Sequence, residues 1–190
     1  MATFDAPQAS DHVQTLWSTR VWMGQLDVVL RDGAPEEMLL EGSPGDVARV
    51  DTEAVLADGQ QVTEGLQGAL SHLLPAVGRS WSIEIDLQVQ VWSGGYSVGL
   101  AYGHGDWQGW CFLASNLDVD GPESGALTLH DPRAGCASVT VPGLPWGRPL
   151  TISPAPGLAV LHPGWLGYSI LPVRADHRIA VLGVTARVGR

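Results

Sequence analysis

Residues 81–92 have the sequence WSIEIDLQVQVW, in which apolar and polar side chains alternate. A β-strand directs successive side chains to opposite faces, so this alternation predicts a strand with one buried face and one solvated face. Eight more short apolar runs follow, from YSVGLAY to RIAVLGV, and Gly, Pro, Asp or Asn residues separate them. About nine strands in roughly a hundred residues indicate a β-sandwich or barrel, and a jelly roll fits that number best.

The first 80 residues show a mixed pattern. Residues 15–30 look extended, and residues 35–46 have the composition of a loop. Residues 62–74 are predicted to form a helix, because their apolar side chains recur on one helical stripe and a proline follows. A length of 190 residues suits one domain with a full core. We therefore expect a single domain over residues 1–190, in which residues 1–80 support a jelly-roll core of residues 81–190.

Charge and cysteine content restrict the partners and the compartment. The formal net charge is −10 and the 10 basic residues are scattered, so no cationic face for a nucleic-acid backbone is expected. Neither a signal-peptide pattern nor an apolar run of membrane-spanning length is present. Cys111 and Cys136 lack a CxxC or zinc spacing, which favours reduced thiols, and Cys111 falls in a predicted buried strand. We expect a cytoplasmic protein that binds a small molecule, but neither nucleic acid nor membrane; its oligomeric state stays open.

Three later segments carry a family resemblance. Residues 104–115 (HGDWQGWCFLAS), 123–135 (ESGALTLHDPRAG) and 158–184 (LAVLHPGWLGYSILPVRADHRIAVLGV) follow one another in this order. They resemble the core segments of the small iron(II) and 2-oxoglutarate-dependent oxygenases, and of a subgroup with the patterns SGALxxxDPR and PxWLxHxVxP followed by an arginine. The resemblance implies a mainly β protein folded as a double-stranded β-helix, a cupin-like form of jelly roll, with a few N-terminal helices.

The resemblance also implies a metal site. In that family a His-x-Asp pair and a distant histidine hold iron(II), and an arginine binds the carboxylate of the cosubstrate through a bidentate fork. His104 and Asp106 supply the first pair, and alternation in an extended strand places both on one face. Arg178 follows Tyr168 by ten residues and takes the place of the carboxylate-binding arginine.

Tyr168 occupies the position at which the family carries its distant histidine. A tyrosine, with a usual pKa near 10, is a poor ligand for iron(II) at neutral pH. One alternative is that His162 serves as the third metal ligand. The other is that the site lacks iron, and that Tyr102, His104, Asp106 and Tyr168 form a polar pocket for acid–base chemistry or binding. In a second register Tyr102, rather than His104, takes the first ligand position.

Two further histidines have simpler interpretations. His130 precedes Asp131, Pro132 and Arg133, which predict a turn in which Arg133 is paired locally. His177 directly precedes Arg178, and we expect it to point to the opposite face, into solvent.

Three functions from different classes are compatible with these residues. The first is an enzyme of the oxygenase superfamily that acts on a small organic molecule with an altered iron and 2-oxoglutarate site. The second is a metal-free enzyme of the cyclase or isomerase type, in which Tyr102, Tyr168 and His104 move protons. The third is a non-catalytic binding protein on the same barrel.

Overall fold

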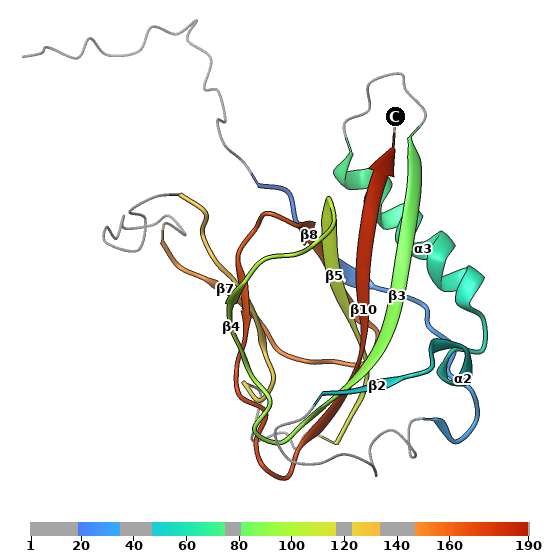
Figure 1. Cartoon of the computed structure of the whole chain (residues 1–190), viewed down its shortest axis with the longest axis vertical. Helices are drawn as coiled ribbons and strands as arrows, with labels where there is room; N and C mark the ends of the chain where they lie inside the picture. The colour runs from blue at the N-terminus through green and yellow to red at the C-terminus, as the bar shows by residue number, and fades with distance from the viewer. Residues whose placement is uncertain (1–18, 35–46, 75–80, 117–122, 134–146, 190) are drawn as a thin grey trace, which may run out of the picture.

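The computed structural model describes residues 19–34, 47–74, 81–116, 123–133 and 147–189. Two antiparallel β-sheets lie face to face, and α3 runs along the outer face of the larger one (Figure 1). The helices are α2 (Thr52–Val55) and α3 (Gly59–Leu73). The strands are β1 (Trp22–Gln25), β2 (Val47–Val50), β3 (Ser82–Ser93), β4 (Val98–Ala101), β5 (Trp107–Ser115), β6 (Leu127–Leu129), β7 (Leu150–Ile152), β8 (Leu158–Pro163), β9 (Tyr168–Ile170) and β10 (Arg178–Gly189).

The order of the strands defines the fold. The larger sheet has the order β1-β8-β5-β10-β3-β2, and the smaller sheet has the order β4-β9-β6-β7. From β3 onward, strands β3, β5, β8 and β10 lie in the larger sheet, while β4, β6, β7 and β9 lie in the smaller sheet. This wrapping of one chain between two antiparallel sheets is a jelly roll of the double-stranded β-helix type. The predicted fold class is therefore confirmed.

The alternation at residues 81–92 is confirmed in β3. Val89 and Val91 are buried under α3, whereas Trp92 is buried in the space between the two sheets. Seven of the other predicted strands form β4 to β10. The eighth, at residues 137–141, lies outside the described residues. The predicted loop at residues 35–46 also lies outside them.

One hydrophobic core lies between α3 and the outer face of the larger sheet. Asp58 caps the helix by accepting a hydrogen bond from the Gln61 backbone N–H at 2.9 Å, which satisfies one of the free donors of the first turn. The predicted stripe packs onto the sheet through the buried side chains Val62, Leu66, Ala69, Leu70 and Leu73. The helix prediction for residues 62–74 is confirmed, while the single-domain organisation stays a prediction. No helix among the described segments is long and apolar enough to cross a membrane.

Cys111 belongs to this core and is fully buried, as its strand pattern predicts. Burial raises the pKa of the Cys111 thiol to about 12, because a thiolate is costly to form in an apolar environment. Cys111 is therefore an inert packing residue at neutral pH. Cys136 lies outside the described residues.

The core between the two sheets is strongly aromatic. Trp92 contacts Phe112 edge-on, with ring centroids 6.3 Å apart, and lies tilted against Tyr96 at 5.6 Å. Aliphatic side chains from β6, β8, β9 and β10 complete this core, among them Leu127, Val160, Ile170, Ile179 and Val181. Side chains thus fill the interior of the jelly roll over much of its length.

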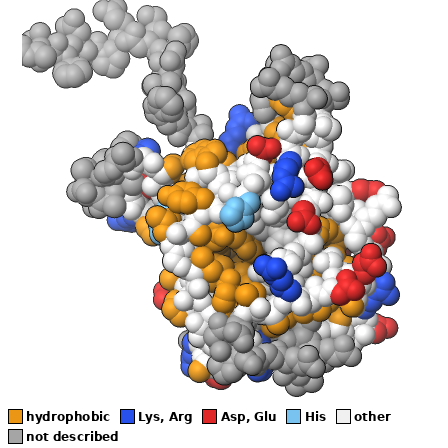
Figure 2. Space-filling view, viewed as in Figure 1, with side chains coloured by type: hydrophobic (Ala, Val, Ile, Leu, Met, Phe, Trp, Pro, Cys, Tyr) orange, Lys and Arg blue, Asp and Glu red, His pale blue; other side chains and the backbone are white. Residues whose placement is uncertain are grey.

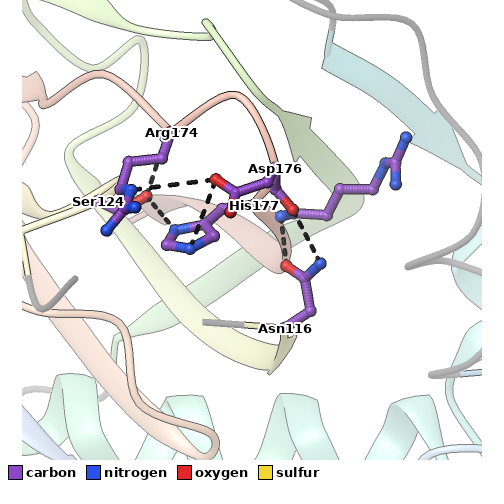
Figure 3. Close-up of polar contacts among 6 residues, drawn as sticks. Asn116, Ser124, Arg174, Asp176 and His177 are labelled. Atoms are coloured by element: carbon purple, nitrogen blue, oxygen red, sulfur yellow. Dashed lines mark hydrogen bonds and ion pairs between the residues drawn. The ribbon is translucent and has the colours of Figure 1, made fainter. Parts of the chain in front are cut away.

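The prediction that His177 lies in solvent is wrong. His177 is only 2% exposed, and its Nδ1 lies 2.9 Å from Ser124 Oγ, which also accepts a hydrogen bond from the Arg174 backbone N–H (Figure 3). The prediction assumed that Arg178 points into the jelly roll. Instead Ile179 does so, and alternation directs His177 to the same side as Ile179.

Ser124 and His177 brace one end of the jelly roll. They connect the turn before β6 to the loop between β9 and β10, and Asn116 adds a bond from its Nδ2 to the Asp176 carbonyl at 3.2 Å (Figure 3). Asp176 Oδ1 lies 3.8 Å from His177 Nε2, but Ser124 is 4% exposed and its hydroxyl is already bonded. This group therefore acts as a structural brace rather than as an accessible nucleophile.

Candidate active site at the β8–β9 end

The opposite end of the jelly roll, where β8 ends and β9 begins, collects the tyrosines that the sequence singles out. Ala101, the last residue of β4, pairs with Tyr168, the first residue of β9. The Gly103 N–H donates to the Gly164 carbonyl at 2.8 Å, which ties the segment after β4 to the turn between β8 and β9. Tyr102 therefore follows β4 at the same end as Tyr168.

Three rings from three strands meet behind this end. Trp110 of β5 contacts Tyr168 edge-on with centroids 4.5 Å apart, and it stacks on His162 of β8 at 5.3 Å. The His162 and Tyr168 centroids are 6.0 Å apart. His162 is fully buried, whereas Tyr168 is half-buried. Of the three rings, Tyr168 and not His162 is therefore positioned to reach a bound molecule.

His162 is held in one neutral tautomer. Its Nδ1 lies 2.8 Å from the Pro163 carbonyl oxygen, which can only accept, so Nδ1 carries the hydrogen. Nε2 then bears a lone pair, and it has no hydrogen-bond partner among the described residues. Burial lowers the pKa of His162, because the imidazolium loses its hydration, although the bond to the carbonyl opposes this shift. His162 is therefore a neutral, buried acceptor.

The tyrosine hydroxyls near this aromatic group are held in the protonated form. Burial raises the pKa of Tyr168, and burial together with the nearby Tyr168 raises the pKa of Tyr96. A phenol with a raised pKa stays protonated at neutral pH and donates a hydrogen bond. Tyr168 is thus suited to donate to an oxygen atom, and poorly suited to bind iron(II) as a phenolate.

The surface beside Tyr168 is apolar. Leu100, Tyr102 and Trp165 are 61%, 57% and 59% exposed, although large hydrophobic side chains usually avoid solvent. A Cβ placed on Gly167 would lie 2.8 Å from the Leu100 side chain and 3.4 Å from that of Tyr102, so both cover this glycine. Figure 2 shows hydrophobic side chains gathered on this face of the molecule.

The three predicted metal ligands are not brought together. His104 and Asp106 lie on an exposed bend between β4 and β5, and Asp106 Oδ2 accepts a hydrogen bond from the Val188 N–H at 2.8 Å. His162 is buried against Trp110. Across the described ranges, no three His, Cys, Asp or Glu side chains are grouped so that they could hold a metal ion. The residues present therefore do not fit a site with three protein ligands for iron(II).

Arg178 lies at the start of β10, at the end of the jelly roll that Ser124 and His177 brace. Its backbone N–H donates to Asn116 Oδ1 at 2.6 Å. Because Ile179 faces the core between the sheets, strand alternation directs Arg178 to the opposite side, with Ala180. The structure thus does not place Arg178 with Tyr168, and its role in binding a cosubstrate stays a prediction.

The turn after β6 forms as predicted. Arg133 donates to both carboxylate oxygens of Asp131, through Nε to Oδ1 at 2.7 Å and through Nη2 to Oδ2. Asp131 also accepts from the Arg133 and Gly147 backbone N–H groups, both at 3.1 Å. His130 Nε2 lies 2.9 Å from Ser169 Oγ on β9. The local pairing of Arg133 is confirmed.

Sequence reasoning missed a cavity next to this turn. Its volume is about 270 Å³, and its lining residues are Thr19, Val21, Leu129, His130, Asp131, Pro132, Arg133, Arg148, Leu150 and Leu166. These residues come from the ends of β6 and β7, the segment before β1 and the β8–β9 turn. Arg148 belongs to no motif in the sequence, so only the three-dimensional arrangement reveals its place.

Comparison with known proteins gives distant structural likenesses only. Neither a family model nor a curated protein matches the chain. A prolyl-4-hydroxylase from Pseudomonas putida aligns at 12% identity with a TM-score of 0.48, over 73% of this chain and 67% of that chain. An oxidoreductase of the 2OG-Fe(II) oxygenase family from Burkholderia pseudomallei aligns at 13% identity with a TM-score of 0.42, over 66% of this chain and 51% of that chain.

A cupin superfamily protein from Desulfitobacterium hafniense aligns at 14% identity with a TM-score of 0.32, over 61% of this chain and 85% of that chain. This chain spans only about half the length of the Burkholderia oxidoreductase. Strand order, rather than these likenesses, establishes the double-stranded β-helix. This is also the fold of the oxygenases that the sequence resembles.

Proposed function

We propose that this chain is a metal-independent enzyme of the oxygenase-like jelly-roll fold, and that it acts on a small organic molecule at the β8–β9 end. The single observation that carries the proposal is Tyr168. Its half-buried ring lies beside that of Trp110 and next to the neutral His162, and burial raises the pKa of its hydroxyl, which stays protonated at neutral pH. A protonated phenol in a partly desolvated site is a suitable hydrogen-bond donor or general acid toward a carbonyl or alkoxide oxygen.

Other residues at this end have supporting roles in the proposal. Tyr102 and Trp165 offer exposed aromatic surface against which an apolar part of the molecule can pack. His162 is too deeply buried to touch the ligand, but its neutral ring lies 6.0 Å from that of Tyr168 and helps to hold Tyr168 in place. Such an arrangement suits isomerase- or cyclase-type proton transfer.

An iron(II) and 2-oxoglutarate oxygenase is the second candidate function. The observation that favours it is the lone pair on His162 Nε2, because a neutral imidazole whose other nitrogen donates to a carbonyl is a typical metal ligand. This alternative requires His104 and Asp106 to leave their exposed positions and join His162. It also requires Arg178 to bind the cosubstrate carboxylate.

Metal titration separates the two candidates. Iron(II) is titrated under anaerobic conditions into the wild type, His162→Ala and Tyr168→His. The metal-independent proposal predicts no stoichiometric binding to the wild type and no effect of His162→Ala on the titration. Stoichiometric binding that His162→Ala abolishes would overturn it in favour of the oxygenase.

A binding measurement tests Tyr168 itself. Acetophenone serves as the probe, because it combines an aromatic ring with a carbonyl acceptor. We expect Tyr168→Phe to weaken its binding about 3- to 10-fold, the range for one neutral hydrogen bond. Tyr96→Phe makes the same chemical change at the neighbouring tyrosine and should weaken acetophenone binding by less than Tyr168→Phe does. Equal affinities for the wild type and Tyr168→Phe would remove Tyr168 from the proposed site.

A further inference from the structure

The cavity near Arg148 lies at an edge where the two sheets meet. β7 is the edge strand of the smaller sheet, and β1 is the edge strand of the larger sheet beside β8. The cavity of about 270 Å³ lies between residues of these edges, with Leu150 from β7 and Val21 from the segment before β1. Leu129 and Leu166, which are nearly fully buried, form part of its lining.

The cavity carries a positive charge in an acidic protein. The described residues of its lining include two arginines and one aspartate, so they carry a formal charge of +1 with His130 neutral, whereas the chain as a whole carries −10. Asp131 is already bound by Arg133. Within the described parts of the chain, Arg148 forms no ion pair and is exposed. Arg148 therefore supplies a positive charge that no ion pair among the described residues balances.

The position of Arg148 is supported by the turn. Asp131 Oδ2 accepts a hydrogen bond from the Gly147 N–H at 3.1 Å, and Gly147 adopts a φ of 71°, a conformation that glycine tolerates without strain. The bond ties the residue before Arg148 to the end of β6. Arg148 thus starts from a backbone held at the edge of the cavity, which reduces the entropy lost when a ligand binds.

We infer that this cavity binds the carboxylate of a small organic acid, with Arg148 as the cation and the hydrocarbon part of the acid against Val21, Leu150 and Leu166. A guanidinium binds a carboxylate through two parallel hydrogen bonds, and apolar walls around a few polar groups are typical of small-molecule sites. A single unbalanced arginine suits a monoanion better than a phosphate with two charges. This inference goes beyond the proposed function, because it uses neither Tyr168 nor His162.

Benzoate titration tests the inference. Benzoate is added to the ¹⁵N-labelled full chain, and backbone amide shifts are followed by NMR. We expect saturable shifts at Gly147 and Leu150, and at least about tenfold weaker binding of benzamide, which has the same ring and no charge. Arg148→Gln should weaken benzoate binding by at least about tenfold, in the range for a charged hydrogen-bonded pair.

Two further variants keep the test decisive. Arg49→Gln removes an exposed arginine on β2, at the far edge of the larger sheet, and should leave benzoate binding unchanged. Leu150→Asp places a negative charge at a position that is already 46% exposed, so it should preserve the fold and abolish benzoate binding. Absence of saturable binding to the wild type would overturn the inference. The same holds if Arg148→Gln and the wild type bind benzoate equally.

Discussion

His162 stacks on Trp110 with ring centroids 5.3 Å apart and planes inclined by 23°. The imidazole is fully buried, and burial is the main reason why the pKa of His162 is lowered. The stack thus excludes water from one face of a neutral histidine and ties the position of β8 to that of β5, its neighbour in the larger sheet.

The lowered pKa predicts a loss of stability on the acid side. A histidine whose folded pKa lies below its unfolded value stabilises the protein fully above about pH 6.5, and this contribution declines as the pH falls from there toward the folded pKa. We therefore expect His162→Gln to lose less stability than the wild type between about pH 7.5 and pH 5.5. Urea unfolding at both pH values measures the difference. The control is His72→Gln, at an exposed position, and it should lose as much stability as the wild type. If all three proteins lost the same free energy of unfolding between the two pH values, burial of His162 would not cause the loss.

A second prediction concerns Gly125, which has a φ of 65° and lies before β6. An added Cβ would collide with Ile179 Cδ1 and lie 3.2 Å from Val173 Cγ2. We expect Gly125→Ala to destabilise the protein by about 2 to 4 kcal/mol, since left-handed backbone strain and overpacking add together.

The control for Gly125 is Gly68 in α3, where an added Cβ has open space. Gly68→Ala should stabilise the protein by up to about 1 kcal/mol, because alanine has the higher helix propensity. Urea unfolding of both variants measures the two effects. Equal effects of the two substitutions would show that the conformation at Gly125 is not required.

Local periodicity accounts for what the sequence predicts correctly. The alternation that ends at Trp92 and the apolar stripe that includes Leu66 and Leu70 each depend on neighbours within one element, so the sequence alone reveals them. The pairing of Arg133 with Asp131 is also local, because the two residues are two positions apart.

The candidate site depends on contacts between distant elements, and these the sequence does not reveal. His177 is buried because a loop folds back onto Ser124, 53 residues earlier. In a strand, either Arg178 or Ile179 can face the core between the sheets, and the choice decides which face every other residue of β10 takes. The structure has Ile179 facing this core, and the local sequence does not distinguish the two choices. Arg148 and Leu150 join a cavity whose other residues come from three separate segments.

The contact between Ser124 and His177 leads to a third prediction. Ser124→Ala removes the acceptor of the Arg174 N–H and the partner of His177 Nδ1, and leaves the buried His177 nitrogen unsatisfied. We expect a loss of about 1 to 3 kcal/mol in the free energy of unfolding. Ser97→Ala, at an exposed position after β3, should change it by less than about 0.5 kcal/mol. If Ser124→Ala were as mild as its control, the brace at this end would not contribute to stability.

The last prediction concerns Asp131, whose side chain is only 8% exposed. Hydrogen bonds from Arg133, and further bonds from backbone N–H groups, hold the pKa of Asp131 well below its usual range, against the effect of burial. A carboxylate with a lowered folded pKa stabilises the protein above its unfolded pKa of about 3.9, and this contribution is lost as the pH falls through the folded value. At about pH 7 we expect Asp131→Asn to cost about 2 kcal/mol, in the range for hydrogen bonds to a charged group. Urea unfolding measures this cost.

The gap between the wild type and Asp131→Asn should then narrow when the measurement is repeated at about pH 3, because the unfolded wild type is largely protonated there. Asp86→Asn, on the exposed face of β3, should cost less than about 0.5 kcal/mol at either pH. A gap of the same size at both pH values would mean that Asp131 stabilises the turn through its shape alone, and not through its charge.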